Sequence, residues 1–144
     1  MYSLAFSVVK NDADAAEVLS ESIYRAYKNL NTLKSAKSFK PWILRIVHNT
    51  AVELIRKDSK VIPIQEVEAS QAVPVKDDTS IALRSAVESL KQPYRTVVVL
   101  YYYENLSVGQ IAEVTNSTAI AVKQQLSRAR KMLRELLKED FKNE

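Results

Sequence analysis

The sequence predicts an all-α protein made of two small helical domains, residues 1–60 and 79–144, joined by a flexible linker at 61–78. Three observations favour this fold class. Only one Gly and four Pro occur in 144 residues, whereas sheet folds with many tight turns usually need more Gly. Apolar residues recur at steps of three and four along both domains, which is the period of an amphipathic helix. The linker carries two prolines, acidic and small residues, and no sustained period.

The N-terminal domain is predicted to contain two long helices. The first begins near Asp12 or Asp14, and either residue can cap it. Its apolar positions at helical spacing are Ala15, Val18, Leu19, Ile23, Ala26, Tyr27 and Leu30. A polar, basic loop follows at 31–37, and the second helix spans 38–58 with Ser38 able to cap it.

The C-terminal domain is predicted to be a helix-turn-helix domain of four helices, of which the first spans 79–92. The segment 93–105 is ambiguous, because its runs of three valines and three tyrosines favour a strand by propensity. A proline at its start and the lack of a partner strand favour a helix instead. The third helix, 107–115, opens with a capping box formed by Ser107 and Gln110.

The last helix, about 118–137, has an apolar seam at steps of four and three that must be buried: Val122, Leu126, Ala129, Leu133 and Leu136. With the preceding helix and the short turn between them, it forms a helix-turn-helix pattern. The side chains left outside the seam include Gln and Arg, which suit base edges, and Lys, Ser and Thr, which suit phosphates. This outer set is Thr118, Ala119, Ala121, Lys123, Gln124, Gln125, Ser127, Arg128, Arg130 and Lys131. The alternative interpretation is a helical pair that docks on a protein.

The distribution of charge favours a polyanionic partner. Residues 1–60 hold ten Lys and Arg against six Asp and Glu, 61–79 hold one against four, and 80–144 hold ten against seven. The densest cluster is 123–138, with six basic residues and one acidic. Basic patches on a folded scaffold attract DNA or RNA. A solvated helix face accounts for the charge alone equally well.

The composition excludes several classes of function. The absence of Cys excludes disulfides and thiolate chemistry, and with a single His we expect no metal site. No paired acids or Ser-His arrangement supports catalysis, so we expect neither an enzyme nor a cofactor. No apolar run approaches the roughly 20 residues of a membrane span, and the N-terminus lacks the basic start of a signal peptide. The expectation is a cytoplasmic protein without membrane insertion.

Three stretches of the chain resemble bacterial sigma factors. "LSVGQIAEVTNSTAIAVKQQLSRARKMLRELL" looks like their C-terminal DNA-binding domain. "DAAEVLSESIYRAY" and "FKPWILRIVHNTAVELIRK" are similar to two helices of their N-terminal domain. In this order, with an acidic linker between, they cover nearly the whole chain and resemble a sigma factor of the extracytoplasmic-function (ECF) subfamily.

The resemblance implies that the chain binds core RNA polymerase and promoter DNA, with an anti-sigma factor as a further partner. The first domain then docks on the polymerase clamp and melts the minus-ten element. Its implied polymerase-binding residues are Asp14, Glu17, Glu21, Ser22 and Arg25. Its implied minus-ten residues, six of them basic, are Lys34, Lys37, Lys40, Arg45, Asn49, Arg56 and Lys57. The loop 31–38 matches the one that captures a flipped-out base.

The last domain, by the same resemblance, binds the minus-thirty-five element in the major groove. Its candidate residues are Ser117, Thr118, Lys123, Gln124, Gln125, Ser127, Arg128 and Arg130. Arg130 matches a position with a phosphate-binding or packing role. Single-stranded DNA also needs stacking groups, but Phe39 and Trp42 fall on or beside an apolar stripe and are predicted to be core. His48 is predicted to lie on the helix surface rather than act as a ligand or base.

The chain departs from the family pattern at several positions. Asn116 replaces the usual Gly of the turn, where Asn also tolerates a left-handed backbone. Gln125 replaces a basic residue and removes one phosphate-binding charge, and Ser20 replaces Gln on the clamp-docking helix. The family usually has about one more helix upstream of Met1, so we expect a shortened first domain.

Two alternatives to the sigma factor interpretation remain. One is a stand-alone helix-turn-helix regulator that dimerises on an operator and protects two half-sites. The other is a degenerate sigma that acts only through protein partners.

Overall fold

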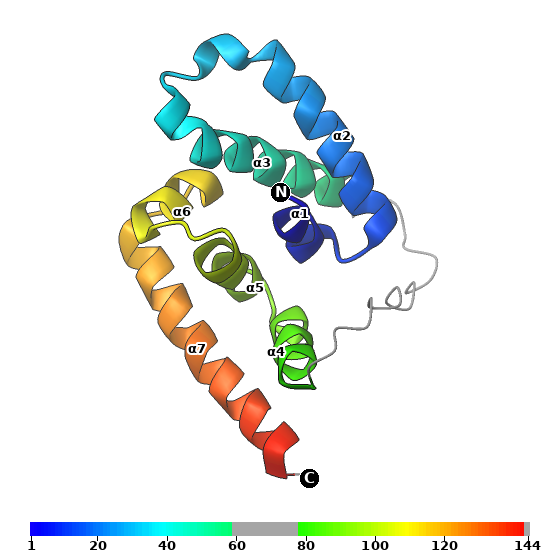
Figure 1. Ribbon diagram of the computed structural model, residues 1–144, viewed down its shortest axis with the longest axis vertical. Helices are drawn as coiled ribbons and strands as arrows, with labels where there is room; N and C mark the ends of the chain where they lie inside the picture. The colour runs from blue at the N-terminus through cyan, green and yellow to red at the C-terminus, as the bar shows by residue number, and fades with distance from the viewer. Residues whose placement is uncertain (59–77, 143–144) are drawn as a thin grey trace.

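The structure, a computed structural model, describes residues 1–58 and 78–142, and these residues form helices and connecting turns (Figure 1). The N-terminal part contains α1 (Tyr2–Val9), α2 (Asp12–Lys28), the short 3₁₀ helices η1 (Leu30–Thr32) and η2 (Ala36–Ser38), and α3 (Phe39–Asp58). The C-terminal part contains α4 (Asp78–Ser89), α5 (Tyr94–Val98), the π-helical η3 (Val99–Tyr103), α6 (Val108–Thr115) and α7 (Ala119–Lys142). The all-α prediction is confirmed for the described residues. The predicted linker, 61–78, lies outside them except for Asp78, which begins α4.

The helix α2 begins where the sequence predicts but is capped by a different residue. Asn11 has an extended backbone, with φ −148°, and its Oδ1 accepts a hydrogen bond from the Asp14 backbone N–H at 2.7 Å. The Asn11 amide also donates to the Asp14 carboxylate at 2.6 Å. The prediction that Asp12 or Asp14 caps the helix is therefore wrong. Both acids instead lie in the first turn, where they interact favourably with the helix dipole.

The buried face of α2 agrees with the predicted stripe only in part. Ala15, Val18 and Ser22 are buried, and α2 packs through them against α1 and α3. Leu19 and Ala26 of the predicted stripe are partly buried against the same core, whereas Ser22 takes the place of the bulkier stripe positions at the contact with α1 and α3. The predicted core positions Ile23 and Tyr27 are accordingly 60% and 81% exposed.

The helix α1 was not predicted, yet it lies at the centre of the molecule. Leu4, Ala5, Ser7 and Val8 are buried, and α1 contacts α2 and α3 on one side and α5 and η3 on the other (Figure 1). A helix buried on several sides lacks the polar face that reveals an amphipathic period. Lys10, the residue that follows α1, caps its C-terminus. Its left-handed backbone (φ 60°) lets its N–H donate to the Phe6 carbonyl at 2.9 Å.

The segment with the valine and tyrosine runs is helical, as predicted. Val97 and Leu100 are fully buried, because α5 and η3 pack against α1, α4, α6 and α7. This burial outweighs the preference of β-branched residues for strands. Tyr102 and Tyr103 are about half exposed, which confirms that the three tyrosines cannot all be buried on one helix.

The two parts of the chain share one hydrophobic core. Leu4 and Val47 from the N-terminal part belong to the same buried cluster as Leu100, Val114 and Leu126 from the C-terminal part. The helix α6 packs directly on α3. On α7 the predicted seam is buried at Val122, Leu126 and Ala129 and half-buried at Leu133 and Leu136.

Candidate nucleic-acid interface

The helices α6 and α7 form a helix-turn-helix whose turn is held by hydrogen bonds. The predicted capping box is present: Ser107 Oγ accepts from the Gln110 N–H at 3.2 Å, and Gln110 Oε1 accepts from the Ser107 N–H at 2.9 Å. Asn116 ends α6 in a left-handed conformation, with φ 55°. The Ser117 N–H then returns to the Ala112 carbonyl at 2.9 Å. This closure sets the direction in which α7 leaves the turn.

The outer face of α7 presents the predicted DNA-contacting side chains. Thr118 Oγ1 accepts from the Ala121 N–H at 3.1 Å and so caps the first turn of α7. Lys123, Gln124, Ser127 and Arg128 are exposed together beyond it. Two other predicted DNA-binding residues are less accessible to DNA. Gln125 is half-buried, and Ser117 is half-buried with its hydroxyl 2.8 Å from that of Thr115.

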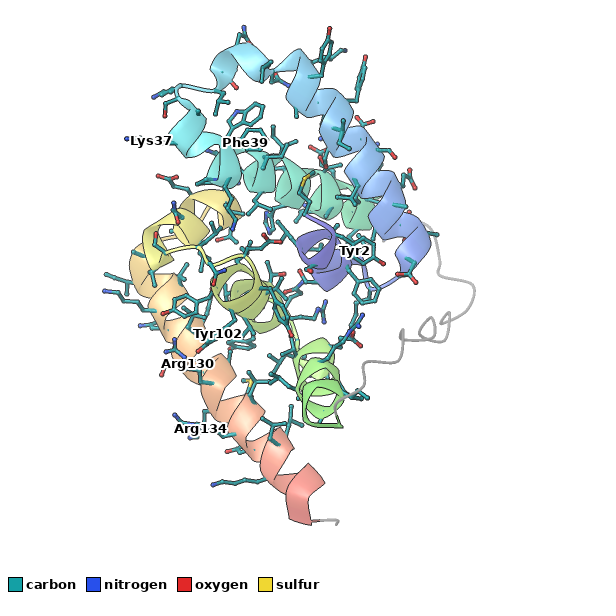
Figure 2. All side chains as sticks on the ribbon, in the orientation of Figure 1. Tyr2, Lys37, Phe39, Tyr102, Arg130 and Arg134 are labelled. Carbon is teal, nitrogen blue, oxygen red and sulfur yellow. The ribbon has the colours of Figure 1, made fainter. Side chains whose placement is uncertain are left out.

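Arg130 is held away from the other candidate residues of α7. Its Nε donates to the Tyr102 hydroxyl at 2.8 Å, and its guanidinium lies 5.4 Å from the Tyr101 ring centre and 5.8 Å from that of Tyr102. Figure 2 shows Arg130 and Tyr102 side by side next to α7. The hydrogen bond that Arg130 donates to Tyr102 is the main cause that raises the pKa of Arg130. Of the two roles implied for Arg130, this geometry matches packing.

The predicted minus-ten residues are spread along α3 and the loop before it rather than gathered at one point. Lys34, Lys37 and Lys40 are exposed near the start of α3, and Arg56 and Lys57 are exposed near its end. A helix rises about 1.5 Å per residue, so these two groups lie more than a helix turn apart. Arg45 and Asn49 lie between them.

Three of the minus-ten residues contact the C-terminal part of the chain. Arg45 Nη2 donates to Asn116 Oδ1 at 3.0 Å, and Asn116 Nδ2 donates to Asn49 Oδ1 at 3.5 Å. The Lys40 ammonium lies 4.0 Å from the carboxylate of Glu104. The structure therefore brings part of the minus-ten set against the turn of the helix-turn-helix.

Of the two aromatic side chains at the start of α3 that are predicted to be core, Trp42 packs against the core and Phe39 does not. Phe39 is 47% exposed and Trp42 is half-buried, with ring centres 6.0 Å apart. The Trp42 indole donates to Thr32 Oγ1 at 3.0 Å and so ties the loop 31–38 to α3. Figure 2 shows Phe39 at the same end of α3 as Lys37. An exposed ring beside cations is the combination that binds single-stranded nucleic acid.

The predicted polymerase-binding residues are only partly available on α2. Glu17 and Glu21 are exposed. Ser22 is fully buried and its hydroxyl donates to the Val18 carbonyl at 2.6 Å, so its prediction as a docking residue is wrong for this structure. Asp14 is half-buried beside the cap residue, Asn11.

Arg25, the fifth predicted polymerase-binding residue, lies in an ion-pair network between α2 and α3. Its Nη2 is 2.7 Å from the Glu53 carboxylate and its Nε is 3.0 Å from that of Glu21. The hydrogen bond from Arg25 is the main cause that lowers the pKa of Glu53. A surface pocket of about 410 Å³ beside this network is lined by Glu17, Glu21, Arg25 and Glu53, among others.

The sequence does not predict the exposed apolar strip that runs along α2 to the start of η1. Ile23, Tyr24, Tyr27 and Leu30 are between 53% and 81% exposed. Three of them, Ile23, Tyr27 and Leu30, belong to the apolar stripe that the sequence predicts to face the core. Ser22, buried next to Ala15 and Val18, is the residue outside the predicted stripe that marks the face packed against α1 and α3. Exposed apolar patches of this kind mark surfaces that bind other proteins.

Three further observations concern His48, metal binding and membrane spans in the described part of the chain. His48 is half-buried rather than on the surface, its Nδ1 has no hydrogen-bond partner among the described residues, and burial lowers its pKa.

Residues 1–58 and 78–142 contain no cluster of three or more His, Cys, Asp or Glu that can hold a metal ion. Within the same ranges no helix has the length and apolar character needed to cross a membrane.

Two sigma factor families match this chain, one in each part. The family "Sigma-70 region 2" matches residues 1–61, and "Sigma-70, region 4" matches residues 80–133. The RNA polymerase sigma factor SigV of Bacillus subtilis (strain 168) is 34% identical over 143 residues, which cover 97% of this chain and 86% of that protein. The ECF RNA polymerase sigma factor SigW of the same organism is 29% identical over 156 residues, covering 96% of this chain and 83% of SigW.

Solved sigma factor structures share the fold of this chain. The sigma factor RpoE from Bartonella quintana, in complex with the anti-sigma factor NepR, matches with a TM-score of 0.78 at 22% identity, covering 95% of this chain and 89% of that chain. CnrH, in complex with the cytosolic domain of CnrY, matches with a TM-score of 0.68 at 22% identity, covering 96% of this chain and 80% of the CnrH chain. The family matches and the sequence identity to SigV over nearly the whole length assign the chain to a family: it belongs to the ECF sigma factors of bacterial RNA polymerase.

Proposed function

We propose that residues 1–60 bind core RNA polymerase and melt the minus-ten element, while residues 79–144 recognise the minus-thirty-five element, so that the chain directs initiation at specific promoters. The observation that carries this proposal is the outer face of α7. The exposed side chains Lys123, Gln124, Ser127 and Arg128 lie side by side on α7. The turn before this helix is held by the Asn116 cap of α6 and the Thr118 cap of α7. This is the arrangement that a recognition helix needs in a major groove.

The proposed minus-ten surface begins at the loop before α3. The exposed ammonium groups of Lys34, Lys37 and Lys40 and the half-exposed ring of Phe39 lie at this end of the helix. Together they supply charge for the phosphates and a platform for an unstacked base. We assign Arg45, Asn49, Arg56 and Lys57 to the continuation of this surface along α3.

The proposed polymerase-docking surface lies on α2 and the start of η1. Glu17 and Glu21 supply its charge, and the apolar strip Ile23, Tyr24, Tyr27 and Leu30 supplies area that a partner can bury. Arg25 is assigned a supporting role, because its guanidinium already bridges Glu21 and Glu53. Ser22 is left out of this surface because it is buried.

We further propose an anti-sigma factor as a regulatory partner, because the structurally similar sigma factor RpoE was solved in complex with the anti-sigma factor NepR. Sigma factors are transcription initiation factors rather than enzymes, and we propose that this chain has no catalytic activity of its own. Its proposed place of action is the cytoplasm, where RNA polymerase is found.

Run-off transcription tests the proposal. Purified chain, core polymerase and promoter DNA selected from a random pool should give a transcript that core polymerase alone does not give. Tight operator binding without initiation would instead support a stand-alone regulator. Polymerase binding without any selected promoter would support a degenerate sigma. Tyr27→Ala should weaken polymerase binding, whereas Ile81→Ala, a control at an exposed apolar residue of α4, should not.

A further inference from the structure

A pocket of about 380 Å³ lies between α1 and α4. Both helices pack on α5, and Figure 1 shows them beside it. Side chains from α1, α4, α5 and η3 line the pocket. None of the residues proposed above to bind DNA or polymerase is among the described residues that line it. Its volume lies in the range of pockets that hold small molecules.

The buried floor of the pocket is mostly apolar. Val87 and Val99 are each 5% exposed, and the Phe6 ring stacks on that of Tyr2 with ring centres 6.0 Å apart. Tyr2 and Tyr103 are about half exposed, so they lie where the pocket opens to solvent. Val99 and Tyr103 belong to the π-helical segment η3, and π-helical turns are frequent at functional sites. The pocket therefore offers buried apolar surface to a ligand that enters from one side.

The charged groups of the pocket are mainly cations. Among the described residues that line it, Lys10, Arg84 and Arg95 carry positive charge and Glu88 carries negative charge. The Glu88 carboxylate is 3.2 Å from Arg84 Nε, so these two charges compensate each other. Within residues 1–58 and 78–142, neither Lys10 nor Arg95 forms an ion pair, and Arg95 donates to two uncharged backbone carbonyls instead. Two cations of the pocket are therefore left without a counter-ion in the described part of the chain.

The charges of Lys10 and Arg95 are close enough to repel each other. Partial burial lowers the pKa of Lys10, and the charge of Arg95 lowers it further. The carbonyl bonds of Arg95 engage two of the five N–H donors of its guanidinium. Lys10 also lies at φ 60°, where Gly or Asn is the usual residue at a helix end, so the turn alone does not explain a lysine here. An anion bound between the two cations removes their repulsion and accepts charge-assisted hydrogen bonds.

We propose that this pocket binds a small amphipathic carboxylate of the medium-chain fatty acid class, with its carboxylate between Lys10 and Arg95 and its chain against Val87 and Val99. The excess of cations selects an anion, and the apolar floor selects a ligand with an apolar part. Inorganic phosphate meets only the first requirement, and a neutral alcohol meets only the second. The site goes beyond the proposed promoter function, and its test needs neither DNA nor polymerase.

Octanoate is the probe for this site in the full chain. Calorimetric titration should show saturable binding, and thermal melts should show a rise in Tm, because a ligand of the folded state stabilises it. Acetate has the charge without the chain, and 1-octanol has the chain without the charge, so each should bind far more weakly. Equal binding of 1-octanol and octanoate would contradict the proposal, because the two cations would then contribute nothing.

Substitutions in the pocket test its position. Lys10→Gln removes one of the two cations and should weaken octanoate binding several-fold. Lys91→Gln is the matched control, because Lys91 is exposed, does not line the pocket and changes the net charge equally. Ser3→Trp places a large ring at an exposed lining position and should abolish binding, whereas Ser3→Ala should preserve it. Equal effects of Lys10→Gln and Lys91→Gln would contradict a contact with Lys10.

The titration of Lys10 gives a readout at the site itself. In a chain with ¹³C-labelled lysines, the Cε resonance of Lys10 follows its protonation, and its loss in Lys10→Gln assigns it. Saturating octanoate should raise the pKa of Lys10 and leave the other lysine resonances unchanged, because a bound negative charge favours the ammonium form. Octanoate that binds without this change lies elsewhere, which overturns the proposal. Binding of an acidic, apolar peptide but not of octanoate also overturns it and assigns the pocket to a protein partner.

Discussion

Arg95 Nε donates a hydrogen bond to the backbone carbonyl of Ser7, a residue 88 positions earlier in the chain. The same guanidinium bonds the Leu90 carbonyl at 2.8 Å, and the Gln92 amide bonds the Ser7 carbonyl at 2.7 Å. Arg95 is only 7% exposed, and this burial is the main cause that lowers its pKa. A buried cation thus joins α1 to α5 through carbonyl groups at the seam between the two parts.

Arg95→Ala should destabilise the protein. The substitution leaves the buried carbonyls of Ser7 and Leu90 without this donor, and hydrogen bonds to charged groups contribute about 1.5–3 kcal/mol each. We expect the free energy of unfolding in urea, followed by far-UV circular dichroism, to fall by about 2–3 kcal/mol. The control is Arg84→Ala, which removes an exposed ion pair with Glu88 and should cost less than about 1 kcal/mol. Equal losses in the two variants would contradict a special role for Arg95.

Glu53→Gln should change how stability depends on pH. The pKa of Glu53 is lowered from its ordinary value of 4.5 mainly by the hydrogen bond from Arg25. A carboxyl group with a lowered pKa in the folded state stabilises the protein at neutral pH, and this contribution is lost as the pH falls through that lowered value. Since both side chains are partly exposed, we expect Glu53→Gln to cost at most about 1 kcal/mol at neutral pH.

Unfolding measured across the acidic range checks this expectation. The difference in stability between the parent chain and Glu53→Gln should begin to shrink as the pH falls below about 4.5 and should disappear at lower pH. Glu113→Gln, at an exposed position on α6, is the control and should run parallel to the parent. A difference that stays constant throughout the acid range would show that Glu53 acts by packing rather than by charge.

Gly109→Ala should stabilise the protein. Gly109 lies in the first turn of α6, and a Cβ added there would have Ser107 Oγ as its nearest neighbour at 4.0 Å, an ordinary contact. Replacing a helical Gly by Ala reduces the entropy of the unfolded chain and is worth up to about 1 kcal/mol. Ser107→Ala should act in the opposite direction by about 1 kcal/mol, because it removes the cap. Thermal melts distinguish the two, and a lower Tm for Gly109→Ala would contradict the prediction.

The features that could be predicted from sequence depend on neighbours along the chain. The capping box of Ser107 and Gln110, the limits of α2 and α3 and the buried seam of α7 are all local patterns, and the structure confirms them. The exposed residues of the candidate minus-thirty-five surface follow from the same seam. Once Val122 and Leu126 are known to face inward, the positions of Lys123 and Arg128 on the outside are determined by the helical period.

The features that could not be predicted depend on which surfaces meet in three dimensions. The helix α2 has two faces that can pack, and the choice of the face with Ser22 over the face with Tyr27 is made by its partners α1 and α3. The contact of Asn116 with Arg45 joins residues 71 positions apart and follows no local pattern. The same holds for Tyr102 and Arg130, whose pairing removes one predicted DNA-binding cation from the outer face of α7.

Lys123→Ala should change the salt dependence of DNA binding more than its sequence preference. Lys123 is exposed on the outer face of α7, and an ammonium group meets phosphate as a point charge without reading bases. Loss of one phosphate contact lowers the slope of log K against log salt concentration by about 1. Titrations of selected promoter DNA at several salt concentrations measure this slope. A slope equal to that of the parent chain would exclude a phosphate contact for Lys123.

Arg128→Ala and Arg130→Ala should have different effects although both remove an arginine from α7. Arg128 is exposed beside Gln124, where its guanidinium can meet a base edge, and a bidentate contact of this kind is worth about 1–3 kcal/mol of discrimination. Arg128→Ala should therefore weaken binding to minus-thirty-five DNA and relax base preference at one position. Arg130 is already bound to Tyr102, so Arg130→Ala should leave base preference unchanged and lower thermal stability instead. Binding competition with single-base variants of the promoter separates the two, and an equal loss of base preference would assign both arginines to DNA.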